Sequence, residues 1–307
     1  MRHFLIDTDT ASDDAVALIM ALREPSIKVE AITVVAGNCP LETCLKNALI
    51  SIERAGTYIP PIYSGIPKPL FRKLFTSEFV HGQDGMGNMN LPQPTLEVQS
   101  THAVDAIIEM AHCFPGELEI VTLGPLSNLA MALLKEPELP ALVKQIYIMG
   151  GAGLGVGNIT PVAEFNFYVD AEAIHLVMQA NFEKTVVGWD VCIAETFINR
   201  SDIAHLNSLG VLGEFTVRCN ASLIEFNKGW GKDGFDLPDP TTMAVALYPD
   251  IVTKKFQAYG YIEYKSEKAY GQFIIDQLQL TGEPHNTTIV TEINAHKFKE
   301  KLFKLLS

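Results

Sequence analysis

Short apolar segments alternate with predicted helices along much of the chain. Val29 to Ala36, Leu118 to Leu123 and Val143 to Met149 are apolar runs that end in polar or glycine-rich turns. Helices are predicted between such runs, over about Ser12 to Arg23 and Leu41 to Ala55. The runs are apolar at consecutive positions, which is typical of strands that are covered on both faces. The pattern therefore predicts an α/β fold with a mostly parallel sheet flanked by helices.

Two long stretches interrupt this alternation. Residues Pro60 to Pro94 are rich in proline and glycine, and Gly150 to Val169 begins with a glycine-rich turn. Loops of this length inside a compact α/β domain usually serve as lids or binding loops. No linker-like composition, internal repeat or low-complexity run divides the chain, so we expect a single domain over residues 1–307.

Polar side chains follow several of the predicted strands directly. Asp7 and Asp9 come after the first apolar run, Phe4 to Ile6, and Asn38 comes after the second. In open α/β sheets, ligands bind outside the carboxyl ends of the strands. We therefore expect the active site at that edge of the sheet, together with the turn that follows Leu123.

Four carboxylates lie close together near the N-terminus, at Asp7, Asp9, Asp13 and Asp14. Helix capping would account for Asp13 and Asp14, but it does not account for the other two. On a strand, Asp7 and Asp9 would point to the same side. Neighbouring carboxylates repel one another unless they share protons or bind a cation, and such oxygen ligands select calcium or magnesium over zinc. The cluster therefore predicts a metal site.

One alternative for this cluster is a magnesium-dependent phosphatase of the haloacid-dehalogenase type. The segment Asp7 to Thr10 loosely fits the motif that opens such enzymes, in which the first aspartate is the nucleophile. That class also has a later acidic pair after a strand. The segment Trp189 to Val191 supplies only one acid, at Asp190, so the phosphatase hypothesis explains less of the chain.

A longer ordered set of motifs resembles the inosine–uridine-preferring nucleoside hydrolase family, and it spans roughly residues 3 to 250. The set begins with the aspartate cluster and ends at Asp239, which precedes an apolar helix. The segments between them, in chain order, are Val35 to Asn38, His81 to Gly87, Leu123 to Ala130, Met149 to Gly151 and Gly157 to Asn166. Each segment alone is a weak signal, and their order makes the resemblance specific.

The resemblance implies calcium-dependent hydrolysis of the N-glycosidic bond of ribonucleosides, giving ribose and free base. This reaction passes through an oxocarbenium-like ribosyl cation that water attacks. By resemblance, the calcium ligands are Asp7, Asp14, Asp239 and the carbonyl of Leu123, and Asp9 is the general base that activates a calcium-bound water. The residues expected to hold the ribose are Asp13, Asn38, Asn158, Glu164 and Asn166.

The chain departs from the family at the step that releases the base. Family members that prefer inosine and uridine carry a histidine just before the aspartate equivalent to Asp239, and this chain has Pro238 there. Replacement candidates are His81 as a proton donor and Trp230 as a stacking surface. Because of this departure, a second alternative stays open, in which the protein binds calcium and ribose without catalysis. Base preference is open as well.

Composition limits the partners and the compartment. The formal net charge is -13, and a surface this acidic makes nucleic acid an improbable partner. The cysteine count of five is odd and contains no CxxC pair, which fits a reducing cytoplasm. No signal peptide or membrane-spanning apolar run is apparent. The resemblance adds an expected homodimer or homotetramer and a role in purine or pyrimidine salvage.

Overall fold

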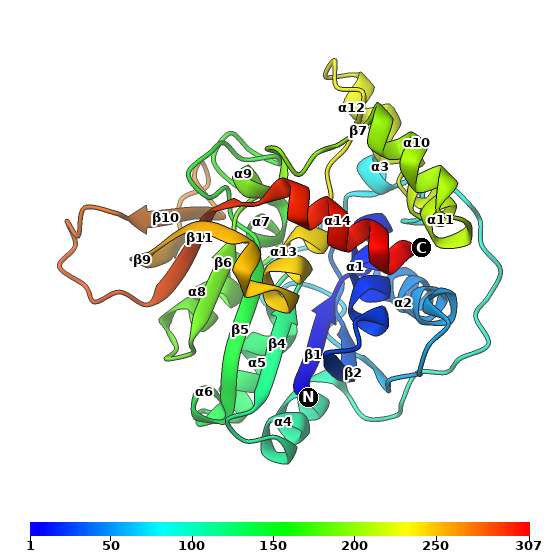
Figure 1. Cartoon of the computed structure of the whole chain (residues 1–307). Helices are drawn as coiled ribbons and strands as arrows, with labels where there is room; N and C mark the ends of the chain where they lie inside the picture. The colour runs from blue at the N-terminus through cyan, green and yellow to red at the C-terminus, as the bar shows by residue number, and fades with distance from the viewer.

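A computed structural model describes all 307 residues, and its centre is a nine-stranded sheet (Figure 1). The strand order across the sheet is β10-β9-β11-β6-β5-β4-β1-β2-β3. The strands are β1 (Arg2–Thr8), β2 (Ile27–Val34), β3 (Ile62–Ser64), β4 (Leu118–Thr122), β5 (Val143–Met149), β6 (Lys184–Val187), β9 (Val252–Glu263), β10 (Gln272–Asp276) and β11 (Thr287–Ile293). All pairings from β3 across to β11 are parallel, which confirms the predicted fold class.

Helices cover both faces of the sheet, and each face has its own apolar core. One core joins α1 (Ser12–Arg23), α2 (Leu41–Ala55), α11 (Val211–Cys219), α13 (Pro238–Leu247) and α14 (Ala295–Leu306). The other joins α4 (Ala103–Cys113), α5 (Ser127–Lys135) and α8 (Ala171–Gln179). Burial on both faces explains why the strand segments lack an alternating polar pattern.

The direction of the strand order changes at β1. From β1 the chain moves outward through β2 to β3, and then returns to β4 on the opposite side of β1. The ends of β1 and β4 are joined there, since the Leu123 amide donates to the Asp7 carbonyl at 2.8 Å. A crevice opens at such a switch point, because successive connections leave it in opposite directions.

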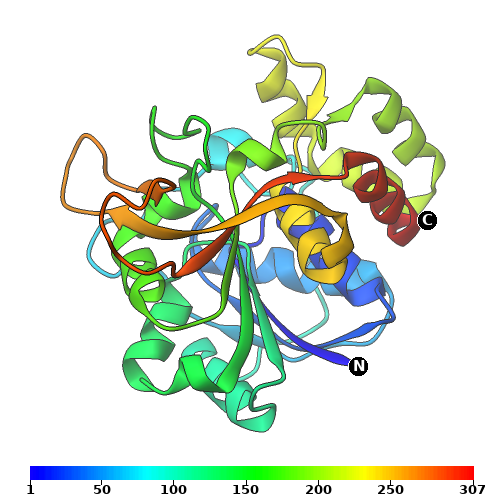
Figure 2. The same cartoon turned by 60° about the vertical axis from the view of Figure 1, so that its left-hand side comes forward.

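The C-terminal edge of the sheet was not predicted from the sequence. Strand β9 pairs antiparallel with both β10 and β11, and Figure 2 shows these strands crossing the molecule away from the N-terminus. Strand β9 alternates exposed and buried residues only over part of its length, so its pattern is mixed.

A smaller group of elements lies above the carboxyl ends of the strands in Figure 1. It comprises α3 (Glu78–His81), α10 (Arg200–Ser208), α11, α12 (Ala221–Lys228) and the two-stranded sheet of β7 (Ile198–Asn199) and β8 (Gly234–Phe235). The remaining short helices are α6 (Leu139–Leu142), α7 (Phe165–Val169), α9 (Trp189–Cys192) and a 3-10 turn (Pro249–Ile251).

The two predicted helices have the expected bounds, and the strands differ from prediction by a few residues at their ends. Strand β1 ends at Thr8, so Asp9 belongs to the following turn. The expectation that Asp7 and Asp9 share one side of a strand is therefore wrong. No helix is long and apolar enough to cross a membrane. The single domain over residues 1–307 stays a prediction.

Candidate active site

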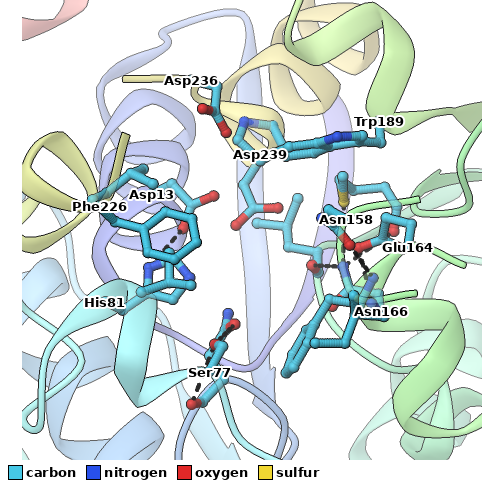
Figure 3. Close-up of a pocket in the computed structure, with 18 of the residues that line it drawn as sticks. Asp13, Ser77, His81, Asn158, Glu164, Asn166, Trp189, Phe226, Asp236 and Asp239 are labelled. Carbon is cyan, nitrogen blue, oxygen red and sulfur yellow. Dashed lines mark hydrogen bonds and ion pairs between the residues drawn. The ribbon is translucent and has the colours of Figure 1, made fainter. Parts of the chain in front are cut away.

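A cavity opens at the carboxyl ends of the strands, next to the switch point (Figure 3). Eight residues expected at the site from the sequence line it: Asp13, Asn38, His81, Leu123, Asn158, Glu164, Asn166 and Asp239. They come from six separate segments of the chain, and the fold brings those segments to one edge of the sheet. Asp7, Asp9 and Asp14 do not line the cavity and are fully buried.

Three carboxylates from two helices form one group at the floor of this cavity. Asp13 and Asp14 stand in the first turn of α1, and Asp239 stands in the first turn of α13. One oxygen from each lies within 4.8 Å of the other two, and all three residues are buried. The two helices pack against each other, which brings together acids that are far apart in the sequence.

Asp7 is not part of this group. Its Oδ1 accepts hydrogen bonds from Thr33 Oγ1 at 2.6 Å and from Asn128 Nδ2 at 2.8 Å, while its Oδ2 has no partner. Thr33 belongs to β2, and Asn128 belongs to α5. Asp7 therefore ties β1 to its neighbours, a contact that the resemblance to known enzymes did not indicate.

Asp9 lies in the turn after β1, between two glycines. Its Oδ2 accepts the backbone N–H of Asn38 at 2.7 Å, and its Oδ1 is buried without a partner. A Cβ added at Gly37 would lie 2.1 Å from Oδ2, and a Cβ added at Gly124 would lie 2.5 Å from Oδ1. Glycine is therefore required at both positions so that the two turns can close around this carboxylate.

Burial and mutual repulsion raise the pKa values of these acids. Burial, together with repulsion from neighbouring carboxylates, raises the pKa of Asp13 to about 7 and that of Asp14 to about 6. The pKa values of Asp9 and Asp239 are also raised well above the usual range, first by burial and then by nearby aspartates. Burial alone raises the pKa of Asp7 to about 7, with no neighbouring aspartate among its main causes.

These residues fit a hard divalent cation. Asp9 Oδ1 and Asp13 Oδ1 are buried oxygens without hydrogen-bond donors, and they stand beside the grouped oxygens of Asp14 and Asp239. A bound cation would offset the repulsion among the carboxylates and would satisfy these oxygens. All the side-chain donors are oxygens, which is the donor set of calcium or magnesium.

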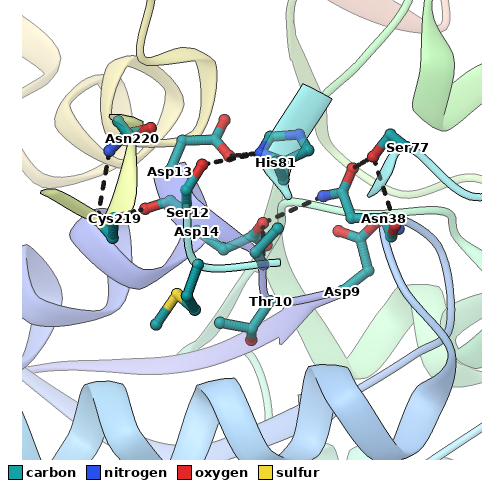
Figure 4. A network of polar contacts seen from close by, with 12 residues as sticks. Asp9, Thr10, Ser12, Asp13, Asp14, Asn38, Ser77, His81, Cys219 and Asn220 are labelled. Carbon is teal, nitrogen blue, oxygen red and sulfur yellow. Dashed lines mark hydrogen bonds and ion pairs between the residues drawn. The ribbon is translucent and has the colours of Figure 1, made fainter. Parts of the chain in front are cut away.

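A hydrogen-bond network fixes the carboxylates from the side of β2 and α3 (Figure 4). Thr8 Oγ1 donates to Asp14 Oδ1 at 2.5 Å, and Asn38 Nδ2 donates to Asp14 Oδ2 at 3.3 Å. Ser77 Oγ in turn donates to the side-chain oxygen of Asn38 at 2.6 Å. Asn38 thus contacts both Asp9 and Asp14, so it orients the floor of the cavity as well as lining its wall.

The opposite wall is built by the segment that leads into α7. Glu164 caps this helix, because its side chain accepts from the N–H groups of Asn166 and Gly151, each at 2.9 Å. Asn166 Nδ2 donates to the Leu123 carbonyl at 2.7 Å, and Asn158 Oδ1 accepts the N–H of Phe165 at 2.9 Å. Burial raises the pKa of Glu164 to about 7. The wall therefore carries polar groups that are held in place by backbone contacts.

His81 ends α3 and faces the acidic floor. Its Nδ1 lies 2.8 Å from Ser12 Oγ and 3.7 Å from Asp13 Oδ1. Burial lowers the pKa of His81 to about 4, and the opposing effects of Asp14 and Asp236 are smaller. The imidazole is therefore neutral at pH 7, which disfavours a role as the resident proton donor.

Trp230 lies outside the cavity. It is 75% exposed, and its ring centroid lies 6.4 Å from that of Phe226. The aromatic side chains that do line the cavity are Trp189, Phe226, Phe79 and Phe165. Trp230 is the stacking candidate from the sequence, but it lies between the end of α12 and β8 with its ring in solvent.

Sequence reasoning missed several lining residues, including Ser77, Trp189, Phe226 and Asp236. Trp189 follows Gly188 at the carboxyl end of β6, so the strand-end rule could have identified it. The other three come from loops and helices outside the strand–helix alternation, and no local pattern marks them.

Known proteins resemble this chain over nearly its whole length. The sequence model of the inosine-uridine preferring nucleoside hydrolase family matches residues 4–300. The pyrimidine-specific ribonucleoside hydrolase RihA of Shewanella sp. (strain ANA-3) is 35% identical over 312 residues, covering 100% of this chain and 96% of that protein.

Solved structures are similar over their whole length. A plant nucleoside hydrolase, PpNRh1, has a TM-score of 0.93 at 28% identity, covering 99% of this chain and 98% of that one. A purine-preferring ribonucleoside hydrolase from Gardnerella vaginalis has a TM-score of 0.92 at 25% identity, with the same coverage. These matches count against both the phosphatase and the non-catalytic alternative. The chain belongs to the inosine-uridine preferring nucleoside hydrolase family and is an enzyme that hydrolyses ribonucleosides.

Proposed function

We propose that this enzyme hydrolyses the N-glycosidic bond of ribonucleosides in a calcium-dependent reaction. The observation that carries the proposal is the group of buried carboxylates with unpartnered oxygens beneath the cavity. Asp14, Asp239 and the Leu123 carbonyl are the proposed calcium ligands. In place of Asp7, the third carboxylate ligand is Asp13, because an oxygen of Asp13 belongs to the group, whereas Asp7 lies outside it and is held through its Oδ1 by Thr33 and Asn128.

The ion supplies a positive charge that makes a neighbouring water more acidic and neutralises the carboxylates around it. Asp9 then accepts a proton from the attacking water, through the oxygen that has no partner within the protein. The Asn38 amide holds the other oxygen of Asp9 and so fixes its orientation. Water adds to the anomeric carbon as the bond from that carbon to the base nitrogen breaks, and the electron pair leaves with the base.

The ribose lies against the polar wall in this proposal. Asn158, Glu164 and Asn166 offer hydrogen bonds to its hydroxyl groups from one side, and Asn38 offers them from the other. Asp13 lies between the floor and the cavity, so it can contact both the ion and a hydroxyl. The carboxylates that border the cavity would also stabilise the positive charge that develops on the ribosyl ring.

His81 was expected to replace the missing histidine as the leaving-group acid. Its low pKa and its contact with Ser12 favour a neutral side chain that positions Asp13 and lines the cavity. In this proposal, solvent or another group supplies the proton that the departing nucleobase takes up. The proposal includes association into a dimer or tetramer, which light scattering after size-exclusion chromatography would test, and a role in base salvage.

A reducing-sugar assay tests the function directly. The purified protein is treated with a chelator, dialysed, and assayed on inosine, adenosine, guanosine, uridine and cytidine with calcium, with magnesium or with neither. We expect ribose release that requires added calcium. Full activity after exhaustive chelation would show that the reaction is metal-independent. Activity restored by magnesium but not by calcium would identify magnesium as the cofactor.

A further inference from the structure

One more buried carboxylate, Asp236, lines the cavity and is not used by the proposed reaction. It stands between β8 and α13, and only 3% of its surface is exposed. It does not belong to the group of Asp13, Asp14 and Asp239 that would hold the ion. Figure 3 shows its carboxylate directed into the cavity on the side away from Asn166. Its environment therefore needs a separate explanation.

The orientation of Asp236 is fixed by one neighbour. Asn227 Nδ2 donates to Asp236 Oδ1 at 3.2 Å and also to the Gly234 carbonyl at 3.1 Å. Asn227 is itself 6% exposed and lines the same cavity. The other oxygen, Oδ2, accepts no hydrogen bond from another residue of the chain. Asn227 is the only other residue that donates to this largely buried carboxylate, so a ligand that donates to Oδ2 would stabilise it.

The surroundings of Asp236 suit a nucleobase. Trp189 and Phe226 line the same cavity as Asp236, and aromatic side chains provide stacking surfaces for bases. Asn158, Glu164 and Asn166, which are proposed to bind the ribose, lie on the opposite wall (Figure 3). A nucleoside whose ribose contacts that wall and the floor therefore places its base on the side of Asp236.

We propose that Asp236, positioned by Asn227, accepts a hydrogen bond from a ring N–H of the nucleobase and so determines base preference. This inference rests on the proposed function. An ionised carboxylate only accepts hydrogen bonds. Uracil and the 6-oxopurines carry a ring N–H beside a carbonyl, whereas cytosine and adenine carry a lone pair at the corresponding nitrogen. Asp236 therefore favours uridine over cytidine and inosine over adenosine.

The test compares Asp236→Asn with the unmodified enzyme, using calcium-loaded protein. The amide keeps an oxygen for Asn227 and replaces Oδ2 with a donor. Asp233→Asn, an exposed acid in the same segment, is the matched control. Values of kcat/KM are measured for uridine, cytidine, N3-methyluridine and p-nitrophenyl riboside, whose leaving group has no ring N–H.

The unmodified enzyme and the control are expected to prefer uridine over both cytidine and N3-methyluridine. In Asp236→Asn, the uridine-to-cytidine ratio of kcat/KM should fall roughly 10- to 100-fold, the size expected for one hydrogen bond to a charged group. The uridine-to-nitrophenyl ratio should fall by a similar factor. These ratios separate recognition of the base from a general loss of activity, and Asp236→Ala provides a second variant if the asparagine protein is unstable.

Three outcomes would overturn the inference. The first is an unmodified enzyme that shows no preference for uridine over N3-methyluridine. The second is an asparagine variant that keeps the original ratios. The third is an equal loss on all substrates, which would give Asp236 a structural role. In these three cases ribose release by the unmodified enzyme would leave the proposed function intact, whereas no release from any nucleoside would refute both.

Discussion

Replacing Asp9 by asparagine separates catalysis from metal binding. The amide is nearly the same size as the carboxylate, and its oxygen can still accept the Asn38 N–H that Asp9 Oδ2 accepts at 2.7 Å. The two glycines that enclose Asp9 leave no room for a larger side chain, but they tolerate an isosteric one. The substitution also removes one charge from a buried group of repelling carboxylates. We therefore expect the variant to fold and to remain at least as stable as the parent without calcium.

The expected loss lies in turnover. An amide cannot accept a proton from the attacking water, and removal of a general base typically costs about 10²- to 10⁴-fold in rate. That loss corresponds to about 2.7–5.4 kcal/mol of transition-state stabilisation, at 1.36 kcal/mol for each tenfold change. Asp14, Asp239 and the Leu123 carbonyl remain in place, so the dissociation constant for calcium should change much less than kcat.

Two measurements on the same preparation decide the matter. Calorimetry gives the calcium affinity of Asp9→Asn, and a steady-state assay with saturating nucleoside and calcium gives kcat. Turnover at the parental rate would show that Asp9 is not the base. Loss of calcium binding together with turnover would make Asp9 a ligand, and the unpartnered Oδ1 would then be its coordinating atom.

Three further results are expected. Asp14→Asn should weaken calcium binding by at least about 100-fold, because it removes a charged ligand. Asp7→Asn should lower the thermal unfolding temperature and leave calcium affinity within about threefold. If calorimetry showed the reverse pattern, Asp7 would be the ligand. Without calcium, the protein should become less stable as pH rises from about 4 to 7, because the raised pKa values of Asp13 and Asp14, about 7 and 6, mean that the folded state holds protons that the unfolded chain has released. Calcium should reverse this trend, since it binds the ionised carboxylates. Thermal melts at several pH values, with chelator or with calcium, test this expectation. The same pH dependence of the unfolding temperature in both series would contradict it. His81→Ala should reduce kcat modestly and equally on uridine and p-nitrophenyl riboside, because a neutral imidazole donates no proton; a loss of about 10²–10⁴ confined to uridine would identify His81 as the acid.

The sequence alone determined the parallel part of the fold and the edge at which the site lies. Apolar runs with no alternation are typical of strands buried on both faces, and several runs here are followed by a turn and a predicted helix. The expected bounds of α1 and α2 agree with the structure for this reason. Since the carboxyl ends of parallel strands meet at one edge, the polar residues after Phe4–Ile6 and after Val34 had to converge.

The sequence did not determine which acids face one another. Local alternation placed Asp7 beside Asp9, but β1 ends at Thr8, and the turn that follows carries Asp9 between Gly37 and Gly124. Asp239 joins Asp13 and Asp14 only because α13 packs against α1, a contact between helices more than two hundred residues apart. Such contacts depend on the shape of the whole core and leave no periodic signal in the chain.

Tertiary structure also decided the base-facing side of the cavity. Trp230 has the residue type expected of a stacking surface, yet it lies beyond the end of α12 and is 75% exposed. Phe226 is one helical turn earlier and lines the cavity, because α12 packs against α3 with that side turned inward. Asp236 enters the same space from the short β8 segment. A side chain reaches a pocket through the orientation of its element, and that orientation is fixed by long-range packing, which residue types alone do not encode.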